Sequence, residues 1–231
     1  MDKDFTQLEK NIGIKFNNIK LLNQALVHRS YLNENTSFPL DNNERLEFLG
    51  DAVLELVVTQ HLYNNFTNPE GDLTNWRSAL VNTNMISKHA KELGYDDFLY
   101  LSRGEAKDIG KARDVILANA FEAVIGAIYL DQGWDVAKDF IEKHIIAELK
   151  KILDEKLYID PKSRLQEEIQ DALKVTPTYQ VLKEWGPDHA RKFKIGVYLE
   201  KKLLGEGEGD SKQEAQVNAA KNAIEREEWK K

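Results

Sequence analysis

The chain has 231 residues, of which 42% are hydrophobic and 31% are charged, and its formal net charge is −7. This composition is that of an ordinary soluble globular protein, and the length allows one or two domains. The absence of cysteine excludes disulfide bonds, thiolate zinc sites and a thiol nucleophile. Residues 1–16 lack the apolar segment of a signal peptide, and the apolar run at residues 115–130 is too short to span a bilayer, so we expect a cytoplasmic protein.

Helical periodicity extends through residues 1–154, and the pattern changes after a polar segment at residues 155–160. In the first part we predict helices near residues 4–11, 18–33, 42–66, 73–93, 111–131 and 135–153. In the second part we predict a helix at 162–173, strands at 178–185, 192–199 and 202–208, and a helix from residue 211 to about 227. The sequence therefore predicts an all-α domain at residues 1–154, a linker at 155–160 and a small α+β domain of order α-β-β-β-α at 161–231.

The helix expected at residues 42–66 has three carboxylates in line. Glu44, Glu47 and Asp51 have the spacing i, i+3 and i+7, which places them within about 60° of one another. The rest of this helix is apolar on nearly all sides, which is typical of a buried helix, and the opposite face has Leu46, Leu49, Val53, Leu56 and Val57. Acids near a helix start also stabilise its dipole, so a solvated acidic face is an equally good interpretation of this helix alone.

The helix expected at residues 111–131 has a similar feature. Between Val115 and Leu130 the only strongly polar side chains are Asn119 and Glu122, which lie on one face at i, i+3. Burial of an unpaired carboxylate is costly, and no Lys or Arg within this run would neutralise it. One interpretation is a hydrogen-bonded Asn–Glu pair in the core; the other is that this face meets the acids of the first helix.

We favour the second interpretation, in which carboxylate and amide oxygens form a site for Mg²⁺ or Mn²⁺. Residues 1–160 have 18 Lys and Arg against 26 Asp and Glu, so this part would bind phosphate only with cations between. Divalent ions held by carboxylates serve phosphate chemistry. The sequence has no glycine-rich phosphate loop, so it gives no indication of a nucleotide cofactor. Hydrolysis of a phosphodiester fits these features.

The segment ERLEFLGDAVL at residues 44–54 resembles the signature of ribonuclease III, the endonuclease that cleaves double-stranded RNA. HRSY at 28–31, PEGDLTNWRSALV at 69–81 and FEAVIGAIYLDQG at 121–133 follow in the family's order, and the C-terminal unit resembles its double-stranded-RNA-binding domain. The resemblance implies an Mg²⁺-dependent endoribonuclease, with Mn²⁺ as a substitute, that works as a homodimer. It further implies products with 5′ phosphates and short 3′ overhangs, processing of structured RNA such as ribosomal precursors, and no membrane partner.

The resemblance also implies roles for individual residues of the first domain. The metal-binding positions are Glu47, Asp51, Asn119 and Glu122, of which Asp51 and Glu122 are also catalytic. Glu44 and Glu70 match two further acidic positions of the active-site cleft. Phe48 matches an aromatic that inserts into the partner subunit, although a place in the monomer's own core is an equally good interpretation of the sequence.

In the second domain, the resemblance implies three RNA-binding segments that recognise an A-form duplex by its shape, phosphates and 2′-OH groups. The first helix presents Ser163, Gln166, Glu167 and Gln170 to a minor groove. The loop with Gly186, Pro187, Asp188 and His189 reaches a second minor groove. Ser211 and Lys212 at the start of the last helix meet phosphates.

Two departures from the family pattern qualify this interpretation. The family's usual residue at position 119 is Asp, and the neutral Asn119 should hold a cation less strongly; the loop at 104–110 also lacks the family's Ser-Gly-Gly. The alternative is therefore a non-cleaving double-stranded-RNA-binding protein whose nuclease site is inactivated at Asn119. The presence of all five acids, Glu44, Glu47, Asp51, Glu70 and Glu122, favours the enzyme.

Overall fold

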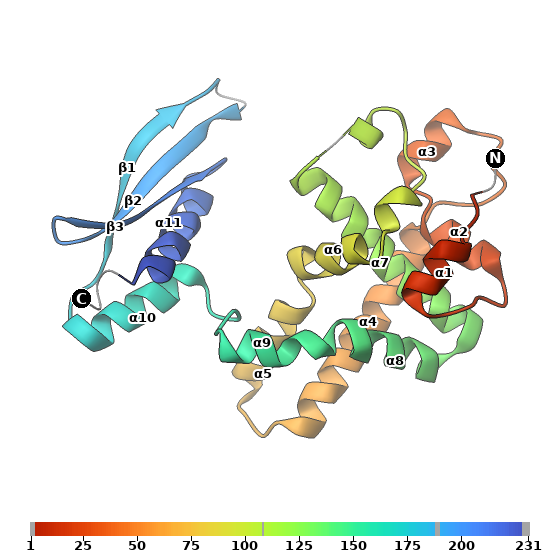
Figure 1. The fold of residues 1–231 in the computed structure, drawn as a ribbon, viewed down its shortest axis with the longest axis horizontal. Coiled ribbons are helices and arrows are strands. Elements are labelled where there is room, and N and C mark those ends of the chain that lie inside the picture. The colour runs from red at the N-terminus through yellow and green to blue at the C-terminus, as the bar shows by residue number, and fades with distance from the viewer. Residues whose placement is uncertain (1–2, 108, 188–189, 228–231) are drawn as a thin grey trace. The chain divides into compact units, whose positions relative to one another are not determined.

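The structure is a computed structural model that describes residues 3–107, 109–187 and 190–227. The chain forms two compact units, Met1–Tyr158 and Ile159–Lys231, each with its own hydrophobic core (Figure 1). The expected linker at 155–160 is largely part of the first unit. The amide of Leu157 donates to the Ile152 carbonyl oxygen over 2.9 Å, and the ring of Tyr158 packs edge-on against Trp76.

The regular elements of the first unit are helices. They are α1 (Thr6–Ile12), α2 (Ile19–Ala25), α3 (Arg29–Glu34), α4 (Glu44–Asn65), α5 (Glu70–Leu80), α6 (Thr83–Glu92), α7 (Lys111–Gln132), α8 (Trp134–His144) and α9 (Leu149–Asp154), with short 3₁₀ helices at Tyr95–Asp97, Glu105–Lys107 and Ile146–Glu148. The two longest, α4 and α7, have 22 residues each and pack against each other more extensively than any other pair of elements. Among the described helices, none combines the length and hydropathy that crossing a bilayer requires.

Three predicted helices are each interrupted in the structure. The expected helix at 18–33 divides into α2 and α3, because the His28 side chain caps α3 and the backbone before it bridges to Tyr100. The expected helix at 73–93 divides at Asn82, whose side chain accepts a hydrogen bond from the Met85 amide. The expected helix at 135–153 breaks after α8 at Ile145. Caps inside an apolar run interrupt a helix without changing its hydrophobic period.

The second unit has the predicted order α-β-β-β-α. Its elements are α10 (Pro161–Leu173), β1 (Thr178–Trp185), β2 (Lys192–Leu199), β3 (Lys202–Gly209) and α11 (Lys212–Arg226), and the strands form an antiparallel sheet of order β1-β2-β3. Asp160 caps α10 and Ser211 caps α11. Leu165 and Ile169 of α10 and Ala219 and other alanines of α11 are fully buried against the sheet. The predicted fold class of both units is confirmed.

Candidate active site and RNA-binding surface

The helices α4 and α7 cross with their backbones in contact. A Cβ atom added at Gly50 would overlap the carbonyl oxygen of Glu122 and lie 2.7 Å from its carbonyl carbon. A Cβ added at Gly126 would lie 3.2 Å from the Gly50 amide nitrogen and would overlap the backbone of α4. Gly50 stands between Glu47 and Asp51, and Gly126 is one turn after Glu122, so the crossing itself brings the acids of the two helices together.

These acids interact electrostatically. Burial, followed by repulsion from Asp51 and Glu47, raises the pKa of Glu122 to about 8. Burial, followed by repulsion from Glu44 and Asp51, also raises the pKa of Glu47. No hydrogen bond joins Asn119 to Glu122 among the described residues, so the interpretation of a core Asn–Glu pair finds no support there.

The remaining predicted acids of the first unit have different surroundings. Glu44 begins α4, where its Oε1 atom is 3.3 Å from Arg29 Nη1 and its Oε2 atom accepts a hydrogen bond from Asn42 Nδ2 over 3.2 Å. Glu70 begins α5 and accepts a hydrogen bond from the Thr74 hydroxyl over 3.1 Å. Among the described residues no group of three acids that could hold a metal includes Glu70, so its place in the cleft stays a prediction.

The acids at the crossing of α4 and α7 offer oxygen ligands, the type of ligand that a hard divalent cation prefers. These ligands are carboxylate oxygens, to which Asn119, one turn before Glu122 on α7, would add an amide oxygen. However, among the described residues no three His, Cys, Asp or Glu side chains are grouped so that they could hold a metal ion by themselves. A cation here would need water or phosphate oxygens as further ligands, which is the usual situation for Mg²⁺.

An apolar face of α4 lies on the side of the acids away from α7. Phe48 is 80% exposed, Leu56 57% and Tyr63 78%, and at 100° per residue these three fall within about 80° of one another. The interpretation of Phe48 as a residue of the monomer's core is therefore wrong. Leu56, expected on the buried face, is also exposed. The sequence cannot show this, because an apolar face that is open in the monomer has the same pattern as one that packs inside it.

The first predicted RNA-binding segment occupies one exposed face of α10. Ser163, Gln166, Glu167 and Gln170 are all exposed at the spacing i, i+3, i+4 and i+7, while Leu165 and Ile169 on the other side are fully buried. In the second segment Gly186 and Pro187 are exposed, and Gly186 has a φ of +92° that favours glycine. Asp188 and His189 lie outside the described residues.

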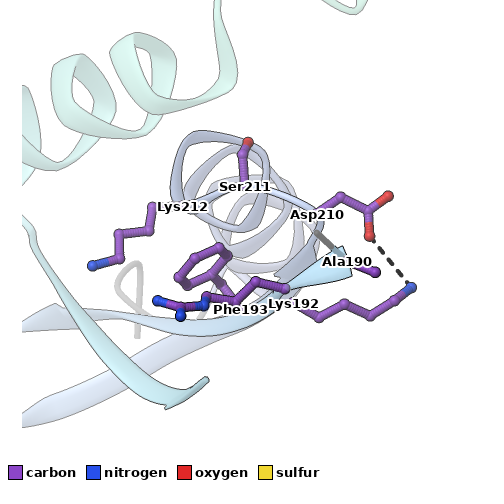
Figure 2. A pocket seen from close by; sticks show the side chains of 7 residues that line it. Ala190, Lys192, Phe193, Asp210, Ser211 and Lys212 are labelled. Atoms are coloured by element: carbon purple, nitrogen blue, oxygen red, sulfur yellow. Dashed lines mark ion pairs between the residues drawn. The ribbon is translucent and has the colours of Figure 1, made fainter. Parts of the chain in front are cut away.

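The third segment borders a surface pocket of about 890 Å³ between the residues that lead into β2 and the start of α11. It is lined by Ala190, Arg191, Lys192, Phe193, Asp210, Ser211 and Lys212. Figure 2 shows Lys192 and Asp210 joined on one side of the Phe193 ring and Lys212 on the other. Arg191 and Lys192 are not among the residues predicted from the sequence, although two cations directly after the predicted loop are a usable signal.

Comparison with known proteins agrees with this geometry. Residues 18–149 match a family model described as Ribonuclease-III-like, and residues 161–227 match the double-stranded RNA binding motif. A protein named Ribonuclease 3 from Dehalococcoides mccartyi is 44% identical, over 96% of this chain and 94% of its own length. The chain belongs to the ribonuclease III family.

Other members of the ribonuclease III family are similarly close. A Ribonuclease 3 from Oceanobacillus iheyensis is 44% identical over 96% of this chain and 97% of its own length. The solved nuclease domain of ribonuclease III from Campylobacter jejuni is 41% identical, with a TM-score of 0.55, and covers 62% of this chain and 99% of that domain. The chain is accordingly a ribonuclease III-type endoribonuclease with a C-terminal motif for double-stranded RNA.

Proposed function

We propose that the chain is an Mg²⁺-dependent cytoplasmic endoribonuclease that cuts both strands of double-stranded RNA and processes structured precursors such as ribosomal RNA. Its products have 5′ phosphates and short 3′ overhangs. The observation that carries this proposal is the coupled group of acids at the crossing of α4 and α7, in which burial, Asp51 and Glu47 raise the pKa of Glu122 to about 8. A carboxylate in these surroundings gains stability from a nearby cation.

In this proposal Glu47, Asp51, Asn119 and Glu122 hold Mg²⁺, and Mn²⁺ substitutes for it. When bound, the ion supplies neutralisation of the phosphate, activation of water and stabilisation of the leaving oxygen. Asp51 is exposed and would be open to incoming RNA, whereas Glu122 is partly buried beside Asp51 and Glu47, where a cation would favour its charged form. Glu44, which Arg29 and Asn42 hold at the start of α4, extends the acidic side of the cleft.

We further propose a homodimer whose interface includes the exposed face of α4 formed by Phe48, Leu56 and Tyr63. Three large apolar side chains exposed on one helix face are typical of an interaction surface. The solved Campylobacter jejuni nuclease domain is described as having a region involved in dimer formation. Because the acids lie beside this face, each active site would stand at the edge of the interface.

Binding of the duplex would rest mainly on the second unit. The exposed face of α10, the loop at Gly186 and Pro187, and Ser211 with Lys212 offer hydrogen-bonding and cationic groups in three separate places. The net charge of residues 161–231 is only +1, from 14 Lys and Arg against 13 Asp and Glu. Shape and 2′-OH contacts therefore carry more of the recognition than charge does.

The test separates cleavage from binding. Glu122→Gln should abolish cleavage of a duplex RNA in Mg²⁺ while leaving its affinity in Ca²⁺ within about twofold, because the RNA contacts lie elsewhere. Glu142→Gln on α8, an equal change of an exposed acid paired with Lys138, should leave both unchanged. Wild-type cleavage by Glu122→Gln would remove Glu122 from the reaction, and a wild type that binds RNA without cutting it would favour the inactive alternative at Asn119.

A further inference from the structure

The cations around the pocket of the second unit are paired with carboxylates. Lys192 Nζ is 3.3 Å from Asp210 Oδ1, and Figure 2 marks this ion pair with a dashed line. Lys212 Nζ is 3.1 Å from Glu184 Oε1, and Arg191 Nη1 is 3.9 Å from Glu184 Oε2. A single carboxylate, that of Glu184, thus faces two cations that come from different parts of the chain.

The strand register holds Glu184 in this place. On β1 it stands directly opposite Phe193 of β2, and the Lys212 ammonium group lies 5.5 Å from the centre of the Phe193 ring. Arg191 directly precedes β2, and Lys212 is the first residue of α11. The side chains of Glu184, Arg191 and Lys212 are 37%, 47% and 58% exposed, so a ligand in solution has access to all three.

We propose that Glu184 is a determinant of RNA affinity, a carboxylate that occupies the cations of the pocket until a phosphate group of the RNA displaces it. The inference rests on the proposed role of Lys212 in phosphate binding. Carboxylate and phosphate oxygens accept the same charge-assisted hydrogen bonds from Arg and Lys. An exposed ion pair is weak enough to exchange, but its acid then remains close to the bound phosphate and repels it. The protein therefore binds RNA less tightly than its cations alone would allow.

Asp210 does not have the same role. Among the described residues it pairs with Lys192 alone, and its backbone amide donates a hydrogen bond to the Glu214 carboxylate over 3.0 Å at the start of α11. Asp210 is therefore part of the helix start. Glu184 is separable from the fold, because it is half-exposed and its carboxylate has only cations as partners among the described residues.

The experiment measures the affinity of the full chain for a perfectly paired RNA duplex in Ca²⁺, as a function of salt. Glu184→Gln should bind about two- to tenfold more tightly than the wild type, which is the scale of one or two exposed ion pairs. The gain should be largest at low salt, so its affinity should fall more steeply as salt rises. Glu184→Asp, which keeps the charge with a shorter reach, should fall between the two.

Two comparisons isolate the mechanism. Glu225→Gln removes the same charge near the other end of α11, about 20 Å from Lys212, and should change the affinity by less than about twofold. Lys212→Gln should weaken binding, and adding Glu184→Gln to Lys212→Gln should recover little, because the main cation that Glu184 occupies is then absent.

The possible failures are distinguishable. If Lys212→Gln weakens binding but Glu184→Gln leaves it unchanged or weaker, the inference about Glu184 is wrong and the RNA-binding role of the unit stands. Equal gains from Glu184→Gln and Glu225→Gln would reduce the effect to net charge and would also overturn the inference. A wild type that does not bind duplex RNA would contradict the proposed function itself.

Discussion

Gly50→Ala tests whether the contact between α4 and α7 determines the geometry of the site. The new Cβ would overlap the carbonyl oxygen of Glu122 and lie 2.7 Å from its carbonyl carbon, whereas ordinary contact begins at 3.4 Å, so the helices must part by more than 0.7 Å, the difference for the carbon alone. Overpacking of this kind costs about 1–3 kcal/mol or more, and the better helix propensity of Ala returns about 1 kcal/mol at most. Because reacting groups misplaced by about 1 Å lose roughly a hundredfold in rate, cleavage should fall by about ten- to hundredfold.

The assay combines thermal unfolding with initial rates of duplex cleavage in Mg²⁺. A net loss of about 1–2 kcal/mol corresponds to a fall of roughly 2–8 °C in melting temperature for a unit of this size. Gly71→Ala is the matched control, because Gly71 also lies in a helix but nothing stands within 4 Å of its added Cβ; its melting temperature should be unchanged or slightly higher. If Gly50→Ala keeps both the stability and the rate of the wild type, the helices do not meet as described.

Three further predictions concern the acids and the exposed face of α4. In metal-free protein, burial raises the pKa of Glu122 from 4.5 to about 8. Its contribution to the free energy of unfolding is therefore fully present below pH 4.5 and is lost as the pH rises through 8. Glu122→Gln, which does not titrate, should remove this loss. The melting temperatures of the two proteins should diverge as the pH rises from about 4.5 to 8 and then stay apart, because over this range the unfolded chain releases the Glu122 proton while the folded protein keeps it; parallel curves would contradict the assignment. Asn119→Asp should lower the Mg²⁺ concentration for half-maximal cleavage with little change in RNA affinity in Ca²⁺; a higher requirement would mean that the position is suited to Asn. Phe48→Asp should convert a dimer into monomers in sedimentation, which a monomeric wild type would refute.

The sequence predicts much of this fold because its patterns are strong where the structure is regular. The acids of α4 and the pair Asn119 and Glu122 stand out by helical spacing, and the strands of the second unit alternate clearly enough to be placed within a residue. What the sequence does not reveal are the features that depend on contacts between elements. The breaks before α3 and α6 arise from caps at His28 and Asn82 inside apolar runs.

The site shows the same limit. The crossing at Gly50 and Gly126 was signalled by a glycine inside each of two buried helices, where glycine is unfavourable by about 1 kcal/mol, but only the structure pairs them. The exposure of Leu56 could not be read from periodicity, since an open apolar face and a packed one have the same pattern. The pairing of Glu184 with Lys212 depends on the approach of β1 to the start of α11 and leaves no trace in local sequence.

The measurement that tests the central proposal most directly is a single gel of perfectly paired RNA incubated with the wild-type protein in Mg²⁺ or in a chelator. We expect cleavage into short duplexes with 5′ phosphates in Mg²⁺ and intact RNA in the chelator, because the acids at the crossing of α4 and α7 require a cation to accept a phosphate group. Cleavage in the chelator would contradict the metal-dependent site, and RNA that is bound but intact at saturating Mg²⁺ would contradict the proposed catalytic function.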